Sequence, residues 1–492
     1  MKFKFLSMGI IAAASAFTFS SCTKEVEKIV YVDKIVKDTV APPSIYTELS
    51  GALSTQSLDA SKRYLIKGIV TVEDGAVLTI PAGTKLFGEK ATKGTLIVKK
   101  GGKLIAEGTA SSPIIFTSNQ GEGEREQGDW GGIILLGKAN VNQNNPAIEG
   151  ITPAVNYGTF QSTANDNDNS GILKYVRIEY AGIALTPNNE TNGLTLGAIG
   201  NGTTIDYIQV TYGGDDSYEW FGGTVNCSHL VAFAGWDDDF DTDFGFSGKV
   251  QYAIGIRDPF NADQSGSNGF ESDNDASGST ATPKTAAVFS NVTLLGPVYD
   301  SAKSTFSGNY QHALHLRRNT ELSLFNSVIV GYPIGLNLDG TLANYTGGNA
   351  VLDNNILVCP GVRGRAPRPF FNGTASDANV ATYWKTTKSN TVFTLNNPQS
   401  TSGSLVYSKT FTDAGIEPTL TMGFNTIAGV NGGSYPKNPN LALFSGATQS
   451  GAAFSDAKLT AWFNSSSTFK GAFGSNDWTD NWSNFNPQNE TY

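Results

Sequence analysis

The densest group of ionisable side chains is the stretch "GWDDDFDTDFGF", residues 235–246, which places five aspartates within seven positions. Like charges this close repel one another, so protons or cations must offset them. Side chains alternate between the two faces of a β-strand, so Asp239, Asp241 and Asp243 are expected to point outward and Phe240 and Phe244 inward. Carboxylate oxygens at this density suit Ca²⁺, which takes roughly six to eight oxygen ligands.

Several other short strand-like segments have the same character, and the ones that would share a wall with this stretch are "NGLTL" (192–196), "SYEWFGG" (217–223), "NGFESDND" (268–275), "HALHLRR" (312–318) and "IGLNLDG" (334–340). If they stack, their outward side chains form a row of Glu219, the aspartates, Glu271 with its neighbours, His315 and Arg317, and then Asn337 and Asp339. We therefore predict a Ca²⁺ site made by Asp239, Asp241, Asp243, Glu271, Asp273 and Asp275. The alternatives are a solvated acidic face and carboxylates that act directly in catalysis.

Aromatic side chains near these acids predict a ligand site. Glu219, Trp220 and Trp236 combine carboxylate and aromatic groups, a combination that suits neutral sugars. The catalytic candidates are the basic residues near the acidic wall, namely Arg257, His315 and Arg317. A structural ion pair with the aspartates is the alternative for Arg257. A glycosidase would need two carboxylates about 5–10 Å apart, and the wall offers too many to select one pair.

The remaining motifs, a histidine pair and a basic stretch, do not point to a specific chemistry. His312 and His315 are three positions apart on a predicted strand, which predicts opposite faces and argues against a shared metal. The basic stretch "RGRAPRP" (363–369) is predicted to be a loop, with an anion grip as the alternative. No Ser-His-Asp order, phosphate loop, Cys-x-x-Cys or His-Glu-x-x-His pattern is present.

The elements that must position these residues form a degenerate repeat. Its runs are "LKYVRI" (173–178), "IDYIQV" (205–210), "CSHLVA" (227–232), "VQYAIG" (250–255), "FSNVTL" (289–294), "FNSVIV" (325–330) and "LDNNIL" (352–357). Their third positions form a column of Tyr175, Tyr207, His229, Tyr252, Asn291, Ser327 and Asn354. A period of about 22 residues without helices predicts a parallel β-solenoid with coils about 4.8 Å apart. His229 is then a packing residue.

The same alignment addresses the cysteines. Cys227 falls in a core column, and Cys359 lies just beyond the last run, four coils away. Four coils correspond to about 19 Å at one strand spacing per coil. A disulfide requires Cα atoms within about 7 Å, so we predict two separate thiols.

Residues 60–360 resemble the right-handed parallel β-helix, the pectin-lyase-like solenoid. The segments "GDWGGIILLG", "GWDDDFDTDFG", "DQSGSNGFESDND" and "GAFGSNDWTDNWSNFNP" also resemble a group of secreted or lipid-anchored Bacteroidetes proteins. The resemblance implies an all-β fold and export. It further implies that an enzyme of this fold could be a Ca²⁺-dependent polysaccharide lyase, with the metal on a substrate carboxylate and a basic residue as proton acceptor.

The ends of the chain predict targeting and capping. Residues 1–21 have a basic start and a short apolar run ending in "FSSC", which resembles a bacterial lipoprotein signal with Cys22 as the acylated residue; ordinary signal cleavage is the alternative. Residues 22–43 are predicted to be a tether, 44–360 the solenoid, and 361–492 a looser continuation and cap. The aromatic-rich part, 459–487, is expected to cap the open end of the solenoid, or alternatively to form a sugar-binding platform.

Composition excludes one function class. The net charge is −10, only 16% of residues are charged, and no basic stripe is present, so nucleic-acid binding is not expected. We predict an exported outer-membrane lipoprotein, held by its lipid at the cell surface. Its solenoid wall would bind a glycan or a surface protein without catalysis, with Ca²⁺ as a stabilising ion. The alternatives are a polysaccharide lyase or glycoside hydrolase, and a structural or adhesive surface component.

Overall fold

The computed structural model describes residues 45–186, 189–298, 306–360, 367–394, 437–439, 441 and 449–492. The predicted signal, Cys22 and the tether therefore lie outside the described residues, as do Arg363 and Arg365. A compact unit begins at Ile45. Within the described ranges, no helix has both the length and the apolar character needed to cross a membrane.

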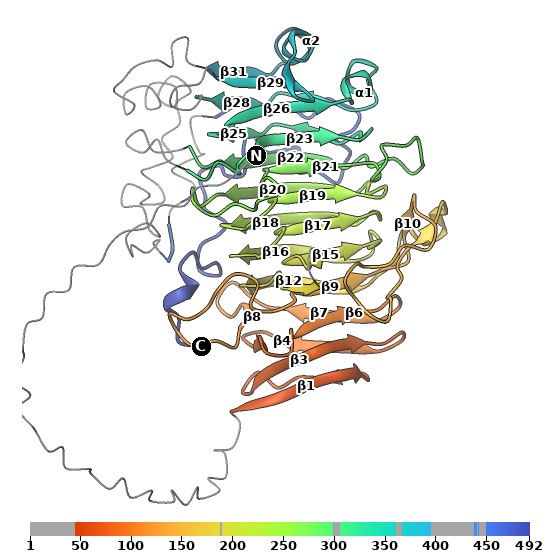
Figure 1. The fold of residues 1–492 in the computed structure, drawn as a ribbon, viewed down its shortest axis with the longest axis vertical. Helices are drawn as coiled ribbons and strands as arrows, with labels where there is room; N and C mark the ends of the chain where they lie inside the picture. The colour runs from red at the N-terminus through yellow and green to blue at the C-terminus, as the bar shows by residue number, and fades with distance from the viewer. Residues whose placement is uncertain are drawn as a thin grey trace, which may run out of the picture. The chain divides into compact units, whose positions relative to one another are not determined.

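The described unit is an all-β, right-handed parallel β-helix, in which 27 of the strands belong to one continuous, mostly parallel sheet (Figure 1). Each coil passes through three walls. We call the first the ladder wall; it consists of the second half of β3 (Arg63–Val72), then β6 (Thr95–Val98), β9 (Ile133–Leu136), β15 (Leu194–Gly197), β17 (Tyr218–Phe221), β19 (Phe240–Asp243), β21 (Phe270–Ser272), β23 (His312–Arg317), β26 (Ile334–Asp339) and β29 (Arg368–Asn372).

The second and third walls share long strands that bend in the middle. These are β12 (Gly171–Glu179), β16 (Thr204–Thr211), β18 (Cys227–Phe233), β20 (Lys249–Ile256) and β22 (Val288–Leu295). In the other coils the walls are separate strands. The second wall has β2 (Gln56–Ser57), β4 (Val77–Pro81), β7 (Lys103–Glu107), β24 (Ser323–Phe325) and β27 (Leu352–Asp353); the third has β5 (Lys85–Gly88), β8 (Ile114–Ser118), β25 (Val328–Val330), β28 (Ile356–Cys359) and β31 (Thr391–Thr394).

The remaining elements lie at ends and insertions. They are β1 (Tyr46–Leu53) at the first coil, the pairs β10 (Asn140–Val141) with β11 (Thr159–Phe160) and β13 (Ala184–Thr186) with β14 (Asn189–Glu190), β30 (Ala375–Ser376), α1 (Leu342–Thr346), α2 (Ala378–Thr382), a π-helical turn Tyr383–Thr387, and short 3₁₀ turns at Thr163–Asn165 and Pro487–Asn489. Strands continue to Thr394, so the solenoid extends past residue 360. Trp384, fully buried beside α2, closes the last coil.

The bend between the second and third walls explains the predicted column. Residues at this bend have positive φ values, from 50° at Tyr175 to 61° at Tyr252, a conformation that Asn tolerates best and that stacked aromatic rings stabilise here. One member was predicted wrongly. Leu324, not Phe325, pairs with Phe289, so the sixth run begins one residue earlier and Asn326 replaces Ser327. His229 stacks between Tyr207 and Tyr252, which confirms its packing role.

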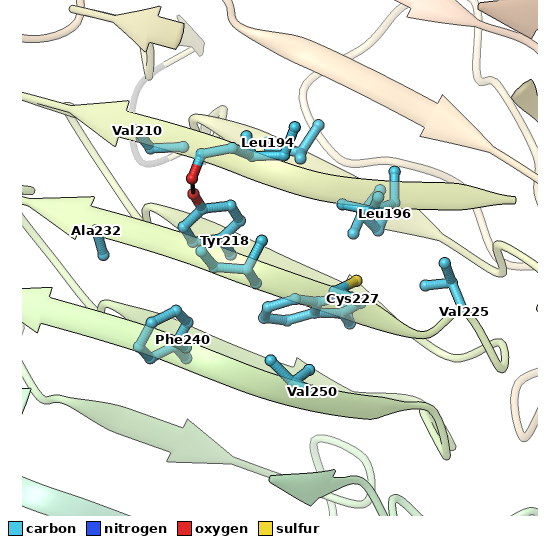
Figure 2. Packing of buried hydrophobic residues seen from close by; sticks show 14 of the residues in the cluster. Leu194, Leu196, Val210, Tyr218, Val225, Cys227, Ala232, Phe240 and Val250 are labelled. Carbon is cyan, nitrogen blue, oxygen red and sulfur yellow. Dashed lines mark hydrogen bonds between the residues drawn. The ribbon is translucent and has the colours of Figure 1, made fainter. Parts of the chain in front are cut away.

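The core fills the space between the walls (Figure 2). Inward side chains of successive coils, such as Leu194, Tyr218 and Phe240, lie in columns, because strands in register place equivalent residues one coil apart. Cys227 and Cys359 are both buried in this core and form no disulfide with each other, as predicted.

The aromatic-rich C-terminal region covers the solenoid, but along its side rather than over its end. We call residues 449–492 the strap. Its Trp482 and Phe485 pack on outward apolar residues of the third wall, and Tyr492 reaches the early coils beside Phe87. Side chains of the wall bind the strap backbone: the amide oxygen of Gln209 accepts from the Asn484 N–H at 2.8 Å. The predicted end cap is therefore corrected to a lateral strap, because the third wall carries an apolar outer face that must be buried.

The sugar-platform alternative concerns the aromatic residues of the strap itself. Phe463, Phe473, Trp482 and Phe485 are buried, and Phe473 stacks on Trp478 with ring centroids 5.0 Å apart. Stacking on a sugar needs a free ring face, and Trp462 of this region is 39% exposed, so the alternative stays a prediction.

Candidate functional site

The ladder wall carries a continuous row of outward polar side chains. In register from coil to coil, Thr195 pairs with Glu219, Glu219 with Asp241, Asp241 with Glu271, Glu271 with His315, and His315 with Asn337. The order of the row is the one that strand alternation predicted. One strand spacing of about 4.8 Å therefore separates successive members.

A second row lies at the corner that precedes each strand, three residues before the first row. Its members are Asn192, Asp216, Asp238, Asn268 and His312. Three of these side chains bind the backbone of the next coil: Asp216 accepts from the Asp238 N–H at 2.8 Å, Asp238 accepts from the Asn268 N–H, and Asn268 accepts from the His312 N–H at 3.0 Å. Sequence reasoning missed this row as a source of ligands, although the repeated spacing of Asp216 to Glu219 and Asp238 to Asp241 is visible in the sequence.

The two rows together form the acidic ladder, which we define as Asp216, Glu219, Asp238, Asp241 and Glu271. Carboxylate oxygens of Asp216, Glu219 and Asp241 lie within 4.8 Å of one another, and so do those of Asp238, Asp241 and Glu271. Asp241 belongs to both triads, and one of its oxygens is buried without a hydrogen-bond partner. A third triad, Asp215, Asp216 and Asp237, shares Asp216 with the first.

Burial makes this arrangement electrostatically costly. It raises the pKa of Asp216, Glu219, Asp238 and Asp241 well above the ordinary range, and the neighbouring carboxylates raise these pKa values further. Burial likewise raises the pKa of Asp237 to about 7. The cluster is thus partly protonated at neutral pH, or it is neutralised by cations with oxygen-seeking chemistry.

Asp239 does not belong to the ladder, which corrects its predicted role as a metal ligand. Its side chain is fully buried and pairs with Arg257, also fully buried, at 3.2 Å. Arg257 donates hydrogen bonds to the Gly235 carbonyl at 3.2 Å and to the Asn268 carbonyl. It therefore links the corner that precedes β19 to the corner that precedes β21. Because it is enclosed, Arg257 cannot touch a ligand and is no longer a catalytic candidate. The alternative, a structural ion pair, is confirmed.

Two other predicted ligands also lie apart from the triads. Asp273 is buried and accepts hydrogen bonds from Arg317 at 2.9 Å and Arg318 at 2.8 Å. Asp275 sits in a turn. Burial alone would raise the pKa of Asp275, but hydrogen bonds from Ser279 and Ser277 outweigh it and lower the pKa to about 2. β21 ends at Ser272, so strand alternation does not extend to these residues.

Asp243 points outward as predicted but accepts from the Phe244 N–H at 2.6 Å, away from the triads. Phe244 was expected inward. It has φ of 49° and stacks on Phe221 in an outer apolar cluster, because the strand ends there and the chain turns. Arg317 binds Glu271 and Asp273, so it neutralises the upper end of the acidic ladder rather than standing free as a base.

The two predicted aromatic ligand residues, Trp220 and Trp236, lie in different environments. Trp220 is fully buried in the core and stacks on Tyr218 and Phe246, which corrects its assignment: strand alternation that turns Glu219 outward turns Trp220 inward. Trp236 is 41% exposed and lines a cavity of about 800 Å³ together with Asp215, Asp237, Asp263 and Glu190. Two of these acids belong to the third triad, so the cavity opens beside the carboxylate cluster.

The two histidines lie together at the other end of the ladder. Their ring centroids are 4.3 Å apart, contrary to the prediction of opposite faces, because His312 occupies the corner row and only His315 follows strand alternation. Burial lowers the pKa of His312 to about 3, so it is neutral. His315 lies between Glu271, 3.4 Å from Nδ1, and Asp339, 3.6 Å from Nε2.

Comparison with known proteins gives the family. Residues 51–402 match the pectate-lyase-like β-helix domain. No curated protein matches the sequence. Among solved structures, the Dettilon tailspike protein is similar over 63% of this chain, with 10% identity and a TM-score of 0.21; the matched region spans 61% of the tailspike chain. The match over most of the chain, together with the coils described above, shows that this chain belongs to the pectate-lyase-like β-helix domain family.

Proposed function

We propose that this protein binds carbohydrate along the ladder wall, without catalysis, and that Ca²⁺ held by the acidic ladder organises the site. One observation carries the proposal: Asp215 and Asp237 of the third triad line a cavity together with the exposed Trp236, and this triad shares Asp216 with the acidic ladder. Aromatic rings offer a face to the C–H groups of sugars, and a cation with free coordination positions takes their hydroxyl oxygens. A glycan is favoured over a surface protein because a cavity of this volume admits a sugar residue rather than a protein surface.

Binding to immobilised neutral and acidic polysaccharides, with Ca²⁺ and with a chelator, tests this function. We expect binding that requires Ca²⁺ and is lost in both Trp236→Ala and Asp241→Asn. Trp462→Ala is the matched control, since Trp462 is 39% exposed and lies on the strap, outside the site. Equal binding by Trp236→Ala and wild type would contradict the proposal.

A glycoside hydrolase is the second candidate, favoured by the close carboxylates. Retaining glycosidases place two carboxyl groups about 5–5.5 Å apart and keep one of them protonated. Oxygens of Asp241 and Glu271 lie within 4.8 Å, and burial raises the pKa of Asp241. Release of reducing ends from polysaccharides, abolished in Asp241→Asn and Glu271→Gln, would show that the protein is a glycoside hydrolase and not a non-catalytic binding protein.

We also propose that the protein is exported and anchored in the outer membrane by acylation of Cys22, at the cell surface. The support is the sequence pattern "FSSC" after a basic start and an apolar run. Incorporation of labelled palmitate during expression in a Gram-negative host, lost in Cys22→Ser, is the expected result. Wild-type protein without label would refute the anchor.

A further inference from the structure

The ladder wall changes its electrostatic character along the solenoid axis. Three coils carry the acidic ladder, and beyond them the corner row continues from His312 through Ile334 to Arg368 in direct register. The outward row continues from His315 through Asn337 to Phe371. Carboxylates are therefore followed by imidazole and guanidinium groups at equivalent positions.

A cavity of about 650 Å³ opens at this basic end. Its lining includes His315, Asn337, Asp339, Arg368 and Phe371. It is separate from the cavity at Trp236, with which it shares no lining residue. Its size is that of a small-molecule or sugar subsite.

One donor in this cavity lacks an acceptor. The Arg368 guanidinium stacks on the Phe371 ring at 4.4 Å, and among the described residues it has no hydrogen bond or ion pair. His315 also lines the cavity, but a carboxylate faces each of its ring nitrogens: Glu271 lies 3.4 Å from Nδ1 and Asp339 lies 3.6 Å from Nε2. Neighbouring polar groups are already paired: the amide of Asn337 donates toward His312 Nε2 at 3.2 Å and accepts from the Gly373 N–H at 2.9 Å.

We infer that this cavity is an oxyanion subsite, in which Arg368 binds a carboxylate, sulfate or phosphate group of the ligand and His315 lies beside the bound group. A guanidinium forms paired hydrogen bonds with such groups, and its stacking on Phe371 pre-orients it. Asp339, the carboxylate that also lines the cavity, lies 3.6 Å from His315 Nε2 and so balances the imidazole rather than Arg368. This inference deepens the proposed glycan binding and rests on it for the source of the anion.

Histidine NMR of the full chain provides the test, because the chain has three histidines. Sulfate, phosphate, acetate and glucuronate are titrated against chloride at constant ionic strength, with glucose as the neutral partner of glucuronate. We expect a saturable shift of the His315 ring signal, while the His229 signal, from the bend between the other two walls, stays unchanged. Arg368→Gln should weaken anion binding by roughly tenfold or more, and Arg63→Gln, at an exposed arginine of an early coil, should not.

The outcomes separate the possible sources of the anion. Tighter binding of glucuronate than of acetate supports an anion carried on a sugar; equal binding supports a free oxyanion. Absence of a saturable His315 shift, or an equal shift in Arg368→Gln, overturns the inference. Because these probes need no polysaccharide and no Ca²⁺, loss of the proposed glycan function leaves this result readable on its own.

Discussion

Arg257 and Asp239 form an ion pair at 3.2 Å in which both side chains are fully buried. Asp239 follows Asp238 of the acidic ladder in the sequence, and Arg257 also donates hydrogen bonds to the carbonyls of Gly235 and Asn268. Removing one partner leaves an uncompensated buried charge, which costs about 3–5 kcal/mol. We therefore expect Arg257→Met to lower the free energy of unfolding by that amount in urea denaturation.

The double variant Arg257→Met with Asp239→Leu is the control for this pair. It removes both charges, so it should lose less stability than Arg257→Met alone. A double variant that is less stable than either single variant would show that the pair is not the source of the effect.

Ca²⁺ should stabilise the protein through Asp241, because this residue belongs to both triads. A ligand at a hundred times its dissociation constant adds about 2.7 kcal/mol to the unfolding free energy. A thermal melt with Ca²⁺ and with a chelator should show an upward shift in wild type and none in Asp241→Asn. Asp275→Asn, outside the triads, should keep the shift. An equal melting temperature of wild type with Ca²⁺ and with chelator would contradict a Ca²⁺ site at the acidic ladder.

Stability without Ca²⁺ should fall as pH rises from about 4 to about 7. Burial raises the pKa of Asp237 from 3.8 to about 7, so the folded state binds more protons than the unfolded state between these values. The unfolding free energy therefore decreases across that window, by about 1.4 kcal/mol for each pH unit between the unfolded and folded pKa values, reduced by solvent screening. Denaturant titrations at pH 5 and pH 8 measure the decrease.

Asp237→Asn should reduce this pH dependence without abolishing it, because it removes one of several buried carboxyl groups whose pKa is raised. Saturating Ca²⁺ should flatten it in wild type, since the metal displaces the protons. If chelated wild type instead gains stability between pH 5 and pH 8, the raised pKa values are contradicted.

The two tryptophans near the acids should behave in opposite ways. Trp220 is fully buried among aromatic rings, so Trp220→Ala should cost about 3–5 kcal/mol. Trp236 is 41% exposed, so Trp236→Ala should change stability by less than about 0.5 kcal/mol. Urea denaturation of both variants is the measurement, and a large loss in Trp236→Ala would mean that this ring packs rather than binds.

The strap should loosen when its largest buried ring is removed. Trp482 is 1% exposed and meets Tyr175 and Tyr207 edge-on. Trp482→Ala should speed hydrogen exchange at the Asn484 N–H, which is held by Gln209, before exchange in the core strands changes. Trp462→Ala, at an exposed position, is the control. Simultaneous loss of protection in strap and core would show that the strap folds with the solenoid as one unit.

The sequence by itself determined the parallel coils and the order Glu219, Asp241, Glu271, His315 and Asn337, because strand alternation and a regular repeat are local properties of the chain. The same alternation could have placed Trp220 in the core, since its neighbour Glu219 points outward.

Only the tertiary structure decided the rest of the site. Corner residues such as Asp216 and Asp238 follow no alternation, so their approach to Asp241 depends on where each coil turns. Asp239 is adjacent to the acidic ladder in sequence but forms an ion pair with Arg257 of the next coil. The strap packs against the apolar outer face of the third wall. Because many coils contribute to this face, no single segment of the sequence reveals it.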